Sequence, residues 1–158
     1  MNKLIVITLC VLLMSSVAQA DVTAWIWGDM DWQTETNMAG MRLGYMGEKN
    51  IEIGVTAQCF AERPRDEVFG GYILLHAGEA VSIDNPLPLG PPTIIADPYG
   101  GYQALFDPSR NGSLSGFVSG FKFMEIMFIE YQWRMAEGDF ETDRNDEHAV
   151  AMGARLQF

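Results

Sequence analysis

Cysteine is scarce in this chain of 158 residues, which contains only Cys10 and Cys59. Cys10 lies in a segment that we expect to be removed, so a framework of internal disulfides is excluded. Basic residues are also few, with 10 lysines and arginines against 21 acids and a formal net charge of −11. Because nucleic acid attracts basic surfaces, we expect no nucleic-acid partner for so acidic a chain.

Long apolar runs are missing as well. The one sustained run, Leu4 to Met14, is shorter than the ~20 residues that a membrane-spanning helix needs. In a lipid bilayer every backbone polar group must be satisfied within the protein. If this chain enters a membrane, it must therefore do so as a closed barrel.

The amino-terminal residues have the pattern of a cleavable signal peptide. Lys3 supplies a positive start, Leu4–Met14 the apolar run, and an AQA sequence ending at Ala20 the cleavage site. We therefore expect a signal peptide over residues 1–20 and a single domain over residues 21–158. Cleavage would leave 138 residues and a formal net charge of −12, because Lys3 is the one charged residue of the leader.

The rest of the chain alternates with a period of two residues. Such alternation is typical of strands whose two faces meet different surroundings. The clearest case is Ile51–Phe60, where an unbroken apolar row alternates with glutamate, glycine, threonine and glutamine. The last segment, Glu147–Phe158, alternates in the same way and ends on an aromatic residue. Small and polar residues opposite an apolar row suit the narrow interior of a small barrel.

Eight alternating segments can be counted. They cover residues 22–33, 38–47, 51–60, 68–81, 99–106, 113–123, 125–135 and 147–158. An even number of strands, each of ~9–11 residues, is typical of bacterial membrane barrels. We therefore predict an all-β protein, an eight-stranded antiparallel up-and-down transmembrane β-barrel.

One stretch fits this prediction poorly. Five prolines lie between Ser82 and Pro98, and proline removes a donor from a strand ladder. We expect most of the stretch to be loop, with Thr93–Ile95 starting the next strand early. If the first strand of such a barrel starts in the periplasm, counting strands up and down puts the stretch on the periplasmic side, where turns are normally short. It is either an inserted loop or a sign that a strand has been miscounted.

The whole pattern resembles the small eight-stranded outer-membrane β-barrel superfamily, of the outer-membrane protein A transmembrane-domain type. The resemblance rests on the AQA leader end, the segment Phe128–Arg134 with the sequence FIEYQWR, and the final segment His148–Phe158. EYQWR is close to the aromatic-rich EYR-like motif of that family. The resemblance implies a monomer in the outer membrane of a Gram-negative bacterium, in contact with its lipid and lipopolysaccharide. It also implies that Phe158 is the assembly signal recognised by the barrel assembly machinery.

Charged residues collect on the rows that should face the interior. They are Asp29, Asp31, Arg42, Glu52, Glu130, Arg134 and Arg155. Because side chains fill the lumen of an eight-stranded barrel, these charges must be paired or hydrated. They could form a plug that closes the lumen, or a gate whose pairs exchange partners to pass small ions. The narrow interior favours the plug, in which Arg155 should meet Glu52 or Glu130.

Signals of catalysis are weak in this sequence. The two histidines, His76 and His148, are accompanied by no serine elbow and no metal-ligand spacing. The acidic stretch from Glu137 to Glu147 lacks the regular spacing of a calcium loop. We therefore predict a non-enzymatic protein with a structural or surface-interaction role and no catalytic, cofactor-binding or metal-binding residues. Three alternatives stay open: a lipid-modifying hydrolase that uses His76 or His148, a small-ion channel, and a soluble lipocalin-like binding barrel.

Overall fold

The computed structural model describes residues 21–31, 37–60, 67–84, 93–108, 112–123, 126–137 and 146–158. Within these ranges, no helix has the length and apolar character needed to cross a membrane. The expected signal peptide, residues 1–20, lies outside them.

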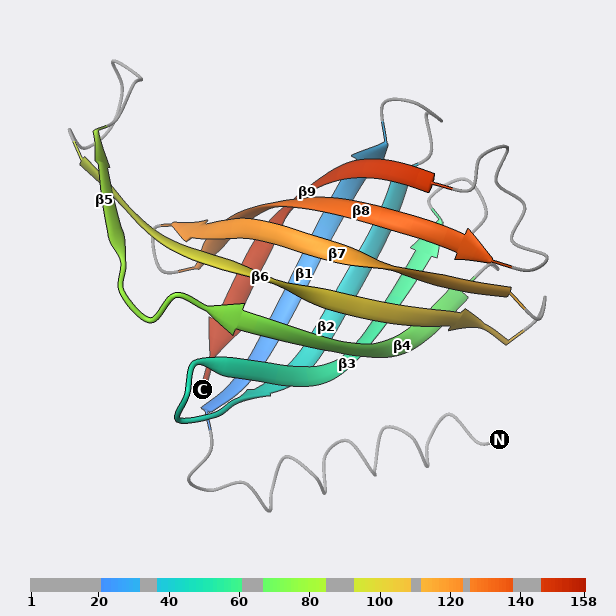
Figure 1. The fold of residues 1–158 in the computed structure, drawn as a ribbon, viewed down its shortest axis with the longest axis horizontal. Coiled ribbons are helices and arrows are strands. Elements are labelled where there is room, and N and C mark those ends of the chain that lie inside the picture. The colour runs from blue at the N-terminus through green and yellow to red at the C-terminus, as the bar shows by residue number, and fades with distance from the viewer. Residues whose placement is uncertain are drawn as a thin grey trace.

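The described residues form one antiparallel sheet of nine strands (Figure 1). They are β1 (Asp21–Asp31), β2 (Asn37–Met46), β3 (Ile51–Phe60), β4 (Glu67–His76), β5 (Val81–Asp84), β6 (Thr93–Asp107), β7 (Gly112–Phe123), β8 (Met127–Glu137) and β9 (Asp146–Gln157). Strand β1 pairs with β9, and β4 pairs with β6, so that eight of the strands close into a ring and β5 stays outside it. The predicted eight-stranded antiparallel barrel is confirmed.

The first and last strands meet along one seam. Val22 and Phe158 exchange backbone hydrogen bonds of 2.9 and 3.2 Å, which bring both ends of the barrel chain to the same rim. We call this rim the terminal end, and it also carries the turn at 47–50 between β2 and β3. The opposite rim, with the connections β1–β2, β3–β4, β6–β7 and β8–β9, is the loop end.

Alternation along each strand separates an outer wall from an interior. Large exposed apolar side chains occur on all eight barrel strands and include Ile26, Met41, Val55, Ile73, Phe106, Phe117, Ile129 and Met152. The interior rows carry glycine where large rings need room. A Cβ atom on Gly40 would overlap the ring of Trp27, which lies across it.

The structure differs from the prediction around β5. The predicted strand 68–81 is divided, because β4 ends at His76 and β5 begins at Val81. Between them Gly78 has a φ of +77°, a conformation that glycine adopts without strain. The expectation that 82–98 is mostly loop is wrong, since β5 runs to Asp84 and β6 covers residues 93–98, but the expected early start of the next strand at Thr93 is confirmed. Residues 85–92 lie outside the described ranges.

Proline is tolerated inside β6 for a local reason. The carbonyl oxygen of Pro98 accepts a hydrogen bond of 2.9 Å from the backbone nitrogen of Ala77, just after the end of β4. In an antiparallel ladder the N–H and C=O of one residue point to the same side. The donor that Pro98 lacks therefore points toward Ala77, the first residue after β4, and away from β7, so the pairing of β6 with β7 loses no hydrogen bond.

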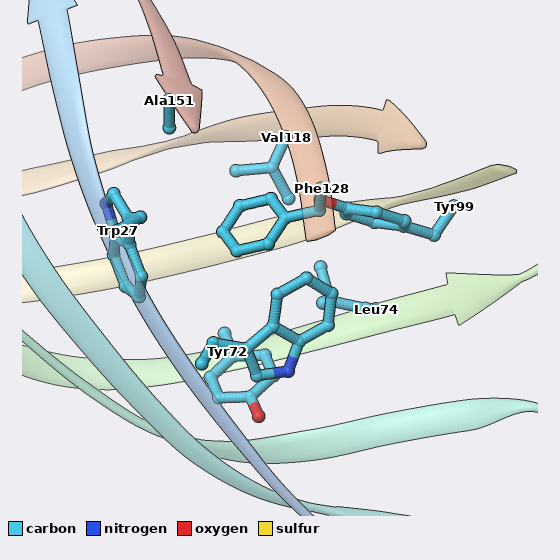
Figure 2. Close-up of a cluster of buried hydrophobic side chains, with 8 residues drawn as sticks. Trp27, Tyr72, Leu74, Tyr99, Val118, Phe128 and Ala151 are labelled. Atoms are coloured by element: carbon cyan, nitrogen blue, oxygen red, sulfur yellow. The ribbon is translucent and has the colours of Figure 1, made fainter. Parts of the chain in front are cut away.

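Two apolar clusters fill the interior. One, toward the terminal end, consists of Trp25, Trp27, Tyr72, Leu74, Tyr99, Val118, Phe128 and Ala151. Figure 2 shows the labelled members of this cluster converging inside the ring of strands. The other lies near the loop end and consists of Met38, Val68, Leu105 and Leu114, with Ala136 packed against them. The polar side chains of the interior lie among these clusters.

Candidate functional site

The predicted interior charges lie inside the barrel. Six of them are buried: Asp29, Arg42, Glu52, Glu130, Arg134 and Arg155. They come from β1, β2, β3, β8 and β9, each from a row that alternates inward. The side chain of Asp31 lies outside the described part of the chain. The six form three groups, spaced along the barrel from the terminal end to the loop end.

Glu52 is the centre of the first group, in the terminal half. Its Oε1 atom accepts hydrogen bonds from the Thr23 hydroxyl at 2.6 Å, the Trp25 indole nitrogen at 2.6 Å and the Tyr72 hydroxyl at 2.7 Å. Three donors on one oxygen compensate much of the cost of removing a carboxylate from water. These donors come from β1 and β4, so Glu52 on β3 links the neighbouring strand β4 to β1, which lies two strands away on the other side.

The other oxygen of Glu52 lies close to nitrogen atoms of two side chains, Arg155 and His76. Its Oε2 atom lies 3.1 Å from a guanidinium nitrogen of Arg155 and 3.2 Å from Nε2 of His76. Of the two acids expected for Arg155, it is therefore Glu52 that the structure places beside it. The Arg155 guanidinium also lies 5.2 Å from the ring centroid of Trp25, an arrangement that favours a cation.

Arg42 and Glu130 form the central pair. The two terminal nitrogens of Arg42 lie 2.7 and 2.9 Å from the two oxygens of Glu130, which is the bidentate geometry of strong ion pairs. Arg42 also donates to Gln103 at 2.9 Å and lies 4.6 Å from the ring centroid of Trp27. Both members of the pair are fully buried, and the ion pair joins β2 to β8, which are separated in the ring by β1 and β9.

Arg134 organises the third group, near the loop end. It is ion-paired with Asp29 and lies 3.9 Å from Glu147. It also donates two hydrogen bonds to the side-chain oxygen of Gln132, at 2.6 and 2.9 Å. Asp29 in turn accepts the backbone N–H of Met38 at 3.0 Å. The apolar cluster of the loop end contains the same Met38, so this group lies directly beneath that cluster.

Sequence patterns did not assign several polar residues to the interior network. They are Tyr72, His76, Tyr99, Gln103, Gln132 and Glu147, all placed on inward rows. The alternation of β6 could have identified Tyr99 and Gln103, since both share a row with Gly101 and Leu105. Glu147 shares its row with Arg155 in β9 and could have been found in the same way.

The two histidines lie on opposite surfaces of the wall. His76 is inside, between Glu52 at 3.2 Å and Asp97 at 3.8 Å. His148 faces outward, where its Nδ1 atom lies 2.5 Å from the hydroxyl of Tyr131. The wall therefore separates them, and they cannot act together on one substrate. Among the described residues, no group of three His, Cys, Asp or Glu side chains could hold a metal ion.

Comparisons with known proteins identify the fold but no family. No family model and no curated protein matches the chain. A solved structure described as "De novo design of transmembrane beta-barrels" is similar over 87% of this chain and 95% of that one, with a TM-score of 0.52 and 10% identity. The N-terminal β-barrel domain of Pseudomonas aeruginosa OprF is similar over 87% of this chain and 100% of that one, with a TM-score of 0.48 and 11% identity. At such low identity a likeness concerns the fold alone, and this chain has the fold of an eight-stranded transmembrane β-barrel.

Proposed function

We propose that this protein is a non-enzymatic β-barrel of the bacterial outer membrane, with a structural or surface-interaction role and a lumen closed by its interior charges. One observation carries the proposal: the barrel has charged residues buried inside and large apolar residues exposed outside. A water-soluble barrel that binds an apolar ligand needs the reverse arrangement.

The outer wall supports a membrane location. Ile26 is 67% exposed, Val55 62% and Phe106 60%, and these residues lie on three different strands. Burial of apolar surface is favourable by roughly 25 cal/mol for every Å² removed from water. In water these exposed side chains would lack that favourable free energy. Surrounding lipid removes that cost on all sides of the barrel at once. Because no edge strand interrupts the ring, the backbone meets the requirement for crossing a bilayer.

The contacts of the interior charges favour a plug that closes the lumen over a gate that passes ions. For Arg42 to leave Glu130 it would have to give up two charge-assisted hydrogen bonds, the bond to Gln103 and the face of Trp27. Glu52, the acid of the group toward the terminal end, is already engaged, because its carboxylate accepts three hydrogen bonds and contacts Arg155 and His76. An exchange of partners would therefore leave a buried charge unpaired, which is costly.

Conductance in planar bilayers tests the plug. The intact protein is expected to show no sustained open events, because paired side chains and two apolar clusters occupy its lumen. A channel-forming porin inserted in the same bilayers is the positive control for detection, because a variant with Arg42→Ala and Glu130→Ala would keep the other two charge groups and both apolar clusters in its lumen. Sustained openings of the unmodified protein would contradict the proposal of a closed lumen.

Export and assembly belong to the same proposal. We propose that residues 1–20 are a signal peptide and that the barrel assembly machinery recognises Phe158. The Phe158 side chain is 69% exposed on the outer wall, so it contributes little to the packed interior and is accessible to another protein. The surrounding partners would be lipid and lipopolysaccharide, and the barrel would act as a monomer.

Deletion of Phe158 is expected to lower the amount of protein in the outer membrane more than it lowers the stability of the finished barrel. Its loss removes an exposed ring and the two backbone bonds to Val22, but no interior contact. The measurements are outer-membrane levels in cells and the urea midpoint of the refolded protein. Phe158→Tyr keeps an aromatic end and is expected to assemble normally. Unchanged membrane levels of the truncated chain would show that Phe158 is not the signal.

A further inference from the structure

One strand of the sheet lies outside the barrel and keeps an open edge. Strand β5 pairs with residues 93–96 at the start of β6 and, within the described ranges, with no other strand. We call these two paired segments the ribbon. Figure 1 shows β5 outside the ring, at the end of the barrel that carries the C-terminus. The far edge of β5 therefore lies beyond the last pairing of the sheet.

Strands β5 and β7 lie on opposite edges of β6. Ala96 shows this directly, because it pairs with Val81 of β5 and also with Phe123 of β7. Strand β4 pairs with the same edge of β6 as β5 does, but only as far as Tyr99. Strand β5 therefore continues the sheet on the side where β4 has ended.

The register shows which backbone groups of β5 face its open edge. The carbonyl oxygen of Pro98 accepts a hydrogen bond from Ala77, so it points to the edge of β6 that β4 and β5 share. Backbone groups of successive residues in a strand point to opposite edges. Ala96 therefore points to that edge as well, toward its partner Val81. The N–H and C=O of Ser82, the next residue of β5, must then point away from β6.

Asp84 has the same backbone orientation as Ser82, because it lies two residues further along β5. Strand β5 thus presents the N–H and C=O groups of two residues at its open edge. An antiparallel or parallel strand from another chain could pair with them, as extended peptides do at the exposed sheet edges of many proteins.

Strand β5 lacks the features with which proteins commonly protect an open edge. Its sequence, VSID, contains no lysine and no proline. Its four residues pair one to one with residues 93–96, so this part of the ladder contains no bulge. A ribbon of two strands is marginally stable in water, and a third strand would stabilise it.

The charges beside the edge determine which strand fits. Glu79 and Asp84 are both exposed, and they are the only charged residues in the segment 77–84. A second copy of this chain would bring the same two acids to the edge, and like charges on paired strands are destabilising. Lysine or arginine side chains on an added strand would instead pair with these acids.

Alternation along β5 specifies the pattern of the added strand. Ser82 and Asp84 share one face, and Val81, which is 50% exposed, lies on the other. A strand that lies beside β5 meets both faces in turn. Basic residues that alternate with apolar ones would therefore place positive charge beside Asp84 and apolar side chains beside Val81.

We propose that the open edge of β5 is a docking site for a basic, extended peptide segment of another protein, which binds by adding a strand to the ribbon. Backbone hydrogen bonds with Ser82 and Asp84 would provide the pairing. The carboxylates of Glu79 and Asp84 would select a basic partner. The site lies outside the ring of barrel strands, so it goes beyond the proposed function and does not depend on a closed lumen.

A synthetic peptide tests the site on the full-length protein in detergent micelles. The probe is a short peptide of alternating lysine and valine, blocked at both ends, and its binding is measured by the fluorescence anisotropy of an attached dye. Bound peptide is expected to slow deuterium exchange of the Ser82 and Asp84 amide hydrogens several-fold, as measured by NMR. The amide hydrogens of Val81 and Ile83 should be protected already without peptide, because they face β6.

The control peptide has the same charge but contains D-valine in place of each L-valine. It cannot form a regular strand and is expected to bind about tenfold more weakly, the effect of roughly one hydrogen bond or more. Equal binding of the two peptides would show that charge attraction alone holds them, and would overturn the proposal. Binding that leaves the Ser82 and Asp84 amide hydrogens unprotected, or no binding at all, would also overturn it.

Variants of the edge provide a second measurement. Ser82→Pro removes an N–H from the open edge and keeps the pairing with β6, so it is expected to weaken binding about tenfold. Ser82→Thr keeps the N–H and should bind like the unmodified protein. Glu79→Gln combined with Asp84→Asn is expected to weaken binding several-fold and to reduce its dependence on salt. Unchanged binding by Ser82→Pro would contradict the proposed edge. A dimer whose Ser82 and Asp84 amide hydrogens are protected without peptide would assign the edge to a second copy of the chain and overturn the proposal.

Discussion

Replacement of Glu130 by leucine is expected to destabilise the folded barrel by about 3–5 kcal/mol, the cost of leaving one member of a buried ion pair without its partner. Arg42 would keep one hydrogen-bond acceptor, Gln103, and the aromatic face of Trp27. Neither neutralises a guanidinium that is fully buried. The free energy of unfolding can be measured by tryptophan fluorescence during urea titration in detergent micelles or vesicles.

The matched control removes both charges. A variant with Arg42→Met and Glu130→Leu is expected to recover most of the lost stability, because a buried pair replaced by apolar residues of similar size is often neutral or stabilising. The comparison isolates the unpaired charge from the loss of side-chain volume. If the single variant costs less than about 1 kcal/mol, the value of an ordinary exposed pair, then water reaches this pair and the lumen is not closed.

Replacement of Gly70 by alanine is expected to prevent folding or to destabilise the barrel by about 3 kcal/mol or more, at the upper end of the cost of overpacking. A Cβ atom at Gly70 would overlap the backbone carbonyl oxygen of Ala104 and lie 2.8 Å from the Cα atom of Leu105. Both contacts are with the backbone of β6, which cannot rotate aside as a side chain could. Strands β4 and β6 would have to separate.

Gly71, the residue next to Gly70, provides the matched control. A Cβ atom at Gly71 meets nothing nearer than the carbonyl oxygen of Gly54, at 3.6 Å, which is an ordinary contact. Gly71→Ala is therefore expected to change the free energy of unfolding by no more than about 0.5 kcal/mol. Refolding yield and urea midpoint of the two variants are the measurements. Equal behaviour of the two would mean that β4 and β6 do not approach as closely as the register requires.

Alternation alone predicts which face each barrel residue occupies. Arg42, Glu130 and Arg155 were placed inside from the sequence because the period of a strand is two, whatever the strand next to it. The same rule separates the outer row of β9 from its inner row. The number of barrel strands follows from the count of alternating segments.

Alternation does not predict which residues meet across the interior. Arg42 and Glu130 are 88 residues apart, and Arg155 and Glu52 are 103 apart. Which of them meet depends on the tilt and stagger of the strands around the ring, and a single strand carries no information on either. Arg155 could therefore be assigned to either of two acids, and only the closed barrel selects Glu52.

The pairing of β5 with the start of β6 was missed for a different reason. Prolines around 86–98 indicate loop when each is considered by itself, since proline lacks a donor. Pro98 is nonetheless inside β6, because its missing donor faces the end of β4 and not the paired strand β7. That exception depends on where β4 ends, a property of another strand and not of the proline segment.

Gel migration in detergent before and after heating tests most directly whether this chain is a closed membrane barrel. Unheated protein taken from phospholipid vesicles is expected to migrate as a compact species, and boiled protein to migrate differently as an unfolded chain. Folding should require lipid or detergent. A folded monomer in aqueous buffer without detergent, with the same migration before and after heating, would contradict the membrane barrel.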